Sequence, residues 1–140
     1  MKTTFDLHAI GAGKEQIEHL ANGGVVFLKG DKGDRGYIVK TGRVEIREGG
    51  RVLETIETSE FFGEMALIDL EPRSASAVAI AGTELIVVDR ETFHMLVRDV
   101  PDFAITMMRL MARRLRAMNA NGRAVEELLP LVQSLTGKSA

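Results

Sequence analysis

Short runs of β-type residues, each followed by turn-forming residues, succeed one another through the middle of this 140-residue chain. Val44, Ile46 and Val52 alternate with charged residues, as expected of a strand with one side in water. Closely spaced short strands are typical of an antiparallel barrel or sandwich. We expect strands at residues 17–20, 25–29, 37–40, 44–47, 52–56, 76–80 and 85–88, with hairpin turns at 21–24 and 48–50.

The chain becomes helical after these strands. Asp89 is a candidate N-cap for a helix through Arg98, with Phe93, Met95 and Leu96 on its packed face. The apolar spacing then predicts a longer helix, from Pro101 to about Ala120. The expected fold is therefore mainly β, an antiparallel barrel at about 15–89 followed by helices at about 90–120. A short amphipathic segment, 124–135, completes the tail at 121–140.

The long predicted helix has two different faces. Its apolar face is rich in methionine and consists of Phe103, Met107, Leu110, Met111, Leu115 and Met118. The other face carries Arg109, Arg113, Arg114 and Arg116, which are by default solvated. The methionine stripe is most simply part of the core, although a second copy of the chain can also pack against such a stripe.

Residues 62–77, FGEMALIDLEPRSASA, carry the clearest chemistry in the chain, and we call them the phosphate cassette. The cassette begins with a predicted helical turn at 65–68, whose unpaired backbone N–H groups at 63–66 favour an anion. Pro72 ends that turn, and Arg73 adds a guanidinium suited to phosphate oxygens. Glu64 needs a hydrogen-bond donor of its own, which a ribose hydroxyl supplies. The pattern predicts a nucleotide with a compact, singly charged phosphate.

The cassette resembles the phosphate-binding segment of the cyclic nucleotide-binding domain, the sensor module of bacterial Crp-type regulators, cyclic-nucleotide-gated channels and the protein kinase A regulatory subunit. This resemblance implies a double-stranded β-helix, or jelly-roll, barrel with C-terminal helices. It also implies that Glu64 holds the ribose 2′-hydroxyl and Arg73 the cyclic phosphate. The expected site contains Gly63, Glu64, Met65, Ala66, Arg73, Ser74 and Ala75, and Arg113 or Arg114 of the long helix caps the base.

A second stretch, residues 30–42, is similar to the glycine-rich hairpin of the same family. Gly30, Gly33 and Gly42 are interpreted as barrel corners rather than ligand contacts, because glycine tolerates positive φ angles. Gly36 departs from the family, which usually has a bulky apolar residue before the aromatic Tyr37. We expect looser packing under that ring. The resemblance spans about Glu15 to Met118, so residues 1–120 are expected to form one domain.

Composition excludes several other classes of function. The net charge of −2 and pI near 5.9 give no basic footprint for direct nucleic-acid binding. Cysteine is absent, and His8, His19 and His94 are too far apart for a metal motif, so no metal or cofactor is expected. No catalytic motif is found, which predicts a protein that is not an enzyme. There is no secretory signal and no membrane-span-length apolar run, so we expect a cytoplasmic protein.

Crp-type regulators continue into a DNA-binding domain, and about twenty residues after Ala120 are too few for one. We therefore expect a regulatory sensor that binds cAMP more readily than cGMP and signals by repositioning its C-terminal helices. Its expected partners are the cyclic nucleotide, a protein effector and a second copy bound through the long helix. The alternative is a degenerate scaffold or dimerisation module that binds no nucleotide.

Overall fold

The structure is a computed structural model, which describes residues 3–11, 15–69 and 71–120. In chain order, its elements are α1 (Leu7–Gly11), β1 (Gln16–Leu20), β2 (Val25–Phe27), β3 (Arg35–Glu48), β4 (Arg51–Ile56), β5 (Phe61–Phe62), α2 (Met65–Ile68), β6 (Ser76–Asp89), α3 (Arg90–Asp99) and α4 (Pro101–Ala120). The predicted tail segment at 124–135 lies outside the described residues.

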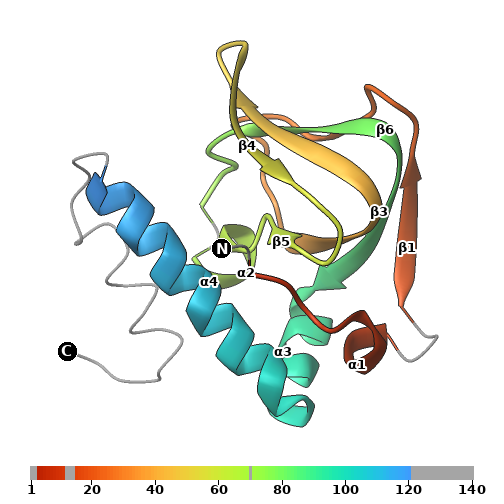
Figure 1. The fold of residues 1–140 in the computed structure, drawn as a ribbon, viewed down its shortest axis with the longest axis vertical. Coiled ribbons are helices and arrows are strands. Elements are labelled where there is room, and N and C mark those ends of the chain that lie inside the picture. The colour runs from red at the N-terminus through yellow and green to blue at the C-terminus, as the bar shows by residue number, and fades with distance from the viewer. Residues whose placement is uncertain (1–2, 12–14, 70, 121–140) are drawn as a thin grey trace.

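The strands form one antiparallel, strongly curved sheet with the order β1-β6-β3-β4. β2 pairs with β6, and β5 pairs with β3, so every shorter strand pairs with one of the two longest strands, β3 and β6. Figure 1 shows the curved sheet on one side of the molecule and α4 lying alongside it. The expected fold class, an antiparallel jelly roll with C-terminal helices, is confirmed, although β1 and β4 do not close the sheet into a complete barrel.

The predicted strand boundaries were wrong in the two long strands. Residues 37–40 and 44–47 belong to the single strand β3, and residues 76–80 and 85–88 both belong to β6. The chain bends at Gly42, an expected corner, and at Ala81 without leaving the ladder, because their positive φ angles (+90° and +67°) turn the backbone locally. The β3–β6 register shifts on either side of Thr41 for the same reason.

The two predicted hairpin turns have different outcomes. Residues 48–50 form a true hairpin, since β3 and β4 pair directly and Gly49 and Gly50 have positive φ angles. Residues 21–24 form a turn in which the amide of Gly24 donates to the carbonyl of Ala21. This turn is not a hairpin, because the strands it joins each pair with β6 rather than with each other.

The predicted helix boundaries are confirmed within two residues. Asp89 caps α3, accepting a hydrogen bond of 2.7 Å from the backbone N–H of Thr92. Phe93 and Leu96 are buried, whereas Met95, which we placed on the packed face, is 42% exposed. Among the residues that the structure describes, no helix is long and apolar enough to span a membrane.

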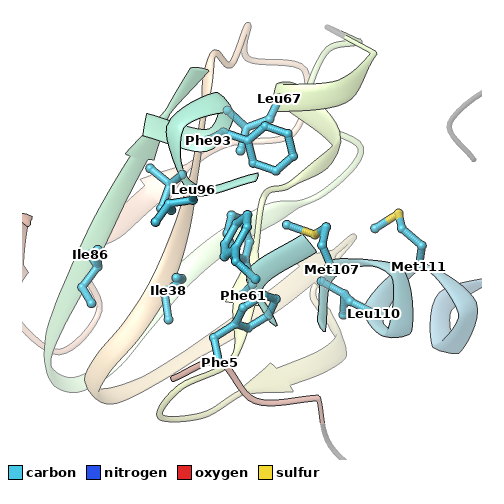
Figure 2. Packing of buried hydrophobic residues seen from close by; sticks show 12 residues of the cluster. Phe5, Ile38, Phe61, Leu67, Ile86, Phe93, Leu96, Met107, Leu110 and Met111 are labelled. Carbon is cyan, nitrogen blue, oxygen red and sulfur yellow. The ribbon is translucent and has the colours of Figure 1, made fainter. Parts of the chain in front are cut away.

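Two clusters of buried residues form the core. One lies between the sheet and the helices and includes Phe5, Ile38, Phe61, Met107 and Leu110. Figure 2 shows Phe61 at its centre, between Ile38 of the sheet and the side chains of α4. The other, within the curve of the sheet, consists of Tyr37, Val39, Val44, Ile56, Phe62, Ala77, Leu85 and Val87. Phe103, Met107, Leu110 and Met111 of the apolar face of α4 are thus part of the core, as predicted.

Gly36 does not loosen the packing under Tyr37, so that prediction was wrong. Tyr37 is only 5% exposed, and its ring stacks on Phe62 with 5.3 Å between centroids. Gly36 is itself buried, and a Cβ at this position would collide with the ring of Phe61 and lie 3.1 Å from Leu67. The missing side chain is therefore replaced by Phe61, which reaches into the same space.

Candidate functional site

The two segments singled out in the sequence meet at Arg73. The amide of Gly30 donates to the carbonyl of Arg73 (2.7 Å), and the amide of Arg73 donates to the carbonyl of Asp31 (2.8 Å). Near this point, the amide of Lys29 donates to the hydroxyl of Ser76 (2.9 Å). The glycine-rich segment at 30–36 is therefore fastened along the cassette, which fixes the backbone that carries Arg73.

The side chain of Arg73 is buried, with 8% of the residue exposed. Its Nη1 donates to the carbonyl of Gly63 (3.1 Å), and its Nη2 donates to the carbonyl of Arg35 (2.8 Å). Its Cζ atom lies 4.0 Å from the centroid of the Phe27 ring. Backbone dipoles and one aromatic face therefore surround the cation.

Within the part of the chain that the structure describes, the buried guanidinium of Arg73 does not have a hydrogen-bond acceptor for each of its N–H donors. Its Nε is buried and has no hydrogen-bond partner among the described residues. Burial lowers the pKa of the Arg73 guanidinium from its usual value, and this effect outweighs the charges of Tyr37, Asp34 and Glu64 that raise the pKa. A buried cation with an unused donor is typical of a site that takes an anion.

Gly33 is not a barrel corner, and that interpretation was wrong. Its φ angle is not in the positive range found at Gly30 and Gly42. A Cβ at Gly33 would instead lie less than 3.0 Å from the Nε, Cζ and Nη2 atoms of Arg73. Gly33 is therefore needed for the close approach of the Arg73 guanidinium, which local sequence reasoning had no means of showing.

A cavity of about 160 Å³ opens beside Arg73. Eight predicted site residues line it, namely Gly63, Glu64, Met65, Ala66, Arg73, Ser74, Ala75 and Arg114. Phe27, Ile46, Asp69, Glu71 and Pro72 also line it, and Phe27 and Ile46 were not predicted as site residues. Both lie in predicted strands, so the alternation of side chains along each strand was the only sequence signal that could have indicated that they line a cavity. Ser74, Asp69 and Glu71 are exposed at the rim.

The turn before α2 brings Glu64 into the cavity. Gly63 has a φ angle of +74°, and a Cβ there would be 2.9 Å from Nη1 of Arg73. The helical turn Met65–Ile68 follows, with Ala66 buried beneath the cavity. The prediction that Pro72 ends this turn was wrong, because the helix already ends at Ile68 with Asp69 as its C-cap.

Glu64 is 2% exposed and pairs with Arg114 from α4. Nε of Arg114 lies 2.6 Å from Oε1 of Glu64, as an ion pair in which the N–H is not aligned for a hydrogen bond. Nη1 of Arg114 also lies 3.8 Å from Glu54. The charge of Glu64 is the main cause that raises the pKa of Arg114, against the opposing effect of burial. The last helix is thus tied to the cavity by charge.

Arg113 takes a different position. Its Nη1 lies 3.6 Å from Oε2 of Glu60, in the loop before β5, and Arg113 does not line the cavity. Glu60 is buried and also accepts a hydrogen bond of 2.8 Å from the amide of Glu57. The two neighbouring arginines therefore bind different parts of the barrel, and neither belongs to a fully solvated helix face.

Comparison with known proteins places this geometry in a family. The family model for the cyclic nucleotide-binding domain matches residues 17–99, more than half of the chain. The chain belongs to the cyclic nucleotide-binding domain family. The match contains the cassette and the glycine-rich segment, so the resemblance found in the sequence is confirmed.

Several relatives of this cyclic nucleotide-binding domain are regulators. The CRP-like cAMP-activated global transcriptional regulator of Mycobacterium tuberculosis is 33% identical over 142 aligned residues, covering 89% of this chain and 63% of the relative. The cyclic AMP receptor protein of Thermus thermophilus is 43% identical over 96 residues, 65% of this chain and 44% of the relative. The chain thus spans less than two thirds of either relative.

A solved structure supports the same assignment. The crystal structure of the Thermus thermophilus catabolite activator protein matches this domain with a TM-score of 0.70 and 38% identity. The match covers 76% of this chain and 53% of that chain. In the part of the chain that the structure describes, no group of three or more His, Cys, Asp or Glu side chains is arranged to hold a metal ion.

Proposed function

We propose that this domain binds a 3′,5′-cyclic nucleotide in the cavity between Glu64 and Arg73 and acts as a sensor. The observation that carries the proposal is the buried guanidinium of Arg73, whose Nε has no partner among the described residues. An isolated buried cation is costly unless an anion compensates it. A singly charged cyclic phosphate satisfies one arginine without requiring a second cation.

The other cavity residues support a nucleotide rather than a bare anion. Glu64 is a buried acceptor that also lines the cavity and is suited to a ribose hydroxyl, and Ile46 and Phe27 add apolar surface. Ala66 and Ala75 are small and buried, which leaves room for the sugar and phosphate. Met65 lines the wall, and the exposed Ser74 can offer a hydroxyl at the rim. Sugar, phosphate and base thus each have a matching surface.

We propose cAMP as the preferred ligand over cGMP. The names of both bacterial relatives refer to cAMP, and they are 33% and 43% identical to this chain. Arg114 is the candidate for contact with the base or sugar, because it lines the cavity, whereas Arg113 does not. A binding role without catalysis agrees with the regulatory names of these relatives.

Signalling follows from the ion pair between Glu64 and Arg114. A ribose hydroxyl that binds Glu64 must share the carboxylate with Arg114 or displace it, since their atoms are 2.6 Å apart. The ligand therefore has one affinity for the domain when α4 keeps this ion pair and another affinity when α4 has moved so that the pair is lost. Differential affinity is what allows a ligand to shift a conformational equilibrium. We propose that α4 carries this shift to a protein effector or a second copy in the cytoplasm.

The test is isothermal titration calorimetry of the wild-type protein with cAMP and cGMP, with the 5′-monophosphates as controls. We expect saturable binding, with cAMP tighter than cGMP. Arg73→Ala should weaken cyclic-nucleotide binding by about 2–5 kcal/mol, because a desolvated phosphate loses its charged partner. Arg109→Ala is the matched control, since Arg109 is an exposed arginine on α4.

Two outcomes would contradict the proposal. Equal affinity in the wild type and Arg73→Ala would remove the phosphate assignment. No binding of any cyclic nucleotide, by folded protein freed of carried-over ligand, would favour the scaffold or dimerisation module. Nucleotide should also raise the melting temperature of the wild type, as linkage requires of a ligand that prefers the folded state.

A further inference from the structure

Three residues surround the guanidinium of Arg73, and we call Phe27, Gly33 and Gly63 the arginine seat. The ring of Phe27 lies under Cζ at 4.0 Å. Gly33 and Gly63 approach so closely that a Cβ on either would lie less than 3.0 Å from guanidinium atoms. These residues come from β2, the loop before β3 and the turn before α2. The seat thus exists only in the folded chain.

Phe27 is itself held in a fixed orientation. Its ring centroid lies 6.3 Å from that of Tyr37 and 6.1 Å from that of Phe62, both of them buried. Phe27 also pairs with Ala77 across the β2–β6 ladder, which fixes its backbone. A cation over an aromatic face is attracted by the negative charge of that face. Phe27 therefore favours one placement of the guanidinium plane.

The seat determines which donors of Arg73 remain for a ligand. An arginine has five N–H donors, and the carbonyls of Gly63 and Arg35 each accept one. Three N–H groups remain, including that of Nε, which has no partner among the described residues. A guanidinium that is already oriented loses less side-chain entropy when it binds an anion. Residues that orient it can therefore raise affinity without touching the ligand's phosphate.

We propose that Phe27 and Gly33 are positioning residues for anion recognition by Arg73. This inference rests on the proposed function, since the anion is the phosphate of the cyclic nucleotide. Phe27 supplies the surface against which the guanidinium lies, and Gly33 supplies the space that its Nε, Cζ and Nη2 atoms need. Gly33 thus acts through its missing side chain rather than through backbone freedom.

Gly33→Ala is the sharpest variant, because the atoms that its Cβ meets are the flexible end of the Arg73 side chain. The guanidinium should move while the fold is kept. Gly82→Ala is the matched control, since Gly82 lacks a positive φ angle and its Cβ would meet nothing within 4 Å. We expect calorimetry to give about tenfold weaker cAMP binding for Gly33→Ala and unchanged binding for Gly82→Ala, with similar melting temperatures of the ligand-free proteins.

Phe27→Leu tests the aromatic surface. It should weaken cAMP binding by about threefold to thirtyfold, the range expected for loss of a cation–π contact. Phe27→Tyr keeps the aromatic ring and should bind cAMP with near wild-type affinity. If Phe27 only filled space, the leucine and tyrosine variants would not be expected to differ in this way. A loss that is equal for leucine and tyrosine would overturn the assignment of Phe27.

The background variant Arg73→Lys keeps the positive charge and removes the planar guanidinium. If Gly33 acts through Arg73, adding Gly33→Ala to Arg73→Lys should cost no more than about twofold further. Full additivity of the two changes would overturn the inference. If Arg73→Lys and Arg73→Ala both bind like the wild type, the proposed function fails instead, so the two failures are distinguishable.

A ligand-independent measurement also tests the seat. In a ¹H–¹⁵N spectrum, the Nε–H proton of Arg73 should show a ring-current shift from Phe27. This shift should be lost in Phe27→Leu, kept in Phe27→Tyr and changed in Gly33→Ala. An Arg73 resonance that is the same in the wild type and in all three variants would overturn the inference whether or not the protein binds a nucleotide.

Discussion

Arg114 of α4 places its Nε atom 2.6 Å from Oε1 of Glu64, a residue that lines the cavity. The last described helix and the candidate ligand site therefore share one charged group. Only 2% of Glu64 is exposed, and among the described residues Arg114 is the ion-pair partner of its carboxylate. A change that separates the pair leaves Glu64 buried without Arg114, and this cost is the basis of the proposed coupling between the position of α4 and the occupancy of the cavity.

Replacing Arg114 by leucine should strongly destabilise the ligand-free domain. The change removes the cation and leaves Glu64 buried without it, which typically costs about 3–5 kcal/mol. Urea unfolding, followed by circular dichroism, measures the free energy of unfolding. Arg109→Leu, on the exposed side of α4, is the control and should change the free energy by less than about 0.5 kcal/mol. Equal effects of the two variants would show that Glu64 does not depend on Arg114.

Replacing Arg113 by alanine should have a much smaller effect than replacing Arg114. Its Nη1 lies 3.6 Å from Glu60, and its side chain is 36% exposed. Glu60 also keeps its hydrogen bond from the amide of Glu57. We expect a loss of about 0–1 kcal/mol in the same urea experiment. A loss as large as that of Arg114→Leu would mean that the Arg113 pair, not the Arg114 pair, holds α4.

Cyclic nucleotide should alter the exchange of backbone amides in residues 101–117. The ligand hydroxyl competes with Arg114 for Glu64, so the local stability of α4 should change on binding. Hydrogen–deuterium exchange with mass spectrometry, with and without saturating cAMP, measures this. Strand β1, which contributes no residue to the cavity, is the internal reference. Identical exchange in α4 under both conditions would exclude helix repositioning as the output.

Asp89 should make the stability of the domain depend on acid pH. The backbone hydrogen bond from Thr92 is the main cause that lowers the pKa of Asp89 below its usual value. Its charged form therefore adds stability above the ordinary pKa of aspartate, and this stability is lost as the pH falls through the lower, folded-state pKa. Asp89→Asn keeps a capping side chain without the charge.

Wild-type protein should therefore exceed Asp89→Asn in stability by about 0.3–1 kcal/mol near neutral pH. The difference should decrease as the pH falls through the lowered pKa of Asp89 in the folded state, because the carboxyl group then becomes protonated. Urea unfolding of both proteins at several pH values measures it. A difference that is constant with pH would show that the Asp89 charge does not stabilise α3.

Gly42→Ala should destabilise the fold. Gly42 has a φ angle of +90°, and a Cβ there would lie less than 3.0 Å from the Thr83 side chain and from the backbone of Gly82 and Thr83. Backbone strain and the clash together should cost about 2–4 kcal/mol. Gly82→Ala, in the neighbouring strand β6, meets nothing within 4 Å and is the control. Thermal unfolding compares the two, and similar melting temperatures would contradict the assignment of Gly42 as a corner.

Much of the site was predictable because its chemistry is local in sequence. Glu64 and Arg73 lie nine positions apart in one cassette, and both line the cavity. Phe27 and Ile46 were missed, since nothing local distinguishes a cavity-lining strand residue from a core residue. The interpretation of Gly33 failed for a different reason. A glycine can serve a turn or a close approach, and only the position of Arg73, forty residues later, separates the two.

The sequence by itself determined the antiparallel strands, the two C-terminal helices with the Asp89 cap, and the cassette, because periodicity, capping and motif spacing act between near neighbours. The tertiary structure decided that β3 and β6 run unbroken through their corners, that Arg114 rather than Arg113 reaches Glu64, and that Phe27 and Gly33 surround Arg73. These outcomes depend on the curvature of the sheet and the rotation of α4 about its axis. Both are set by packing between segments far apart in the chain, which no local pattern encodes.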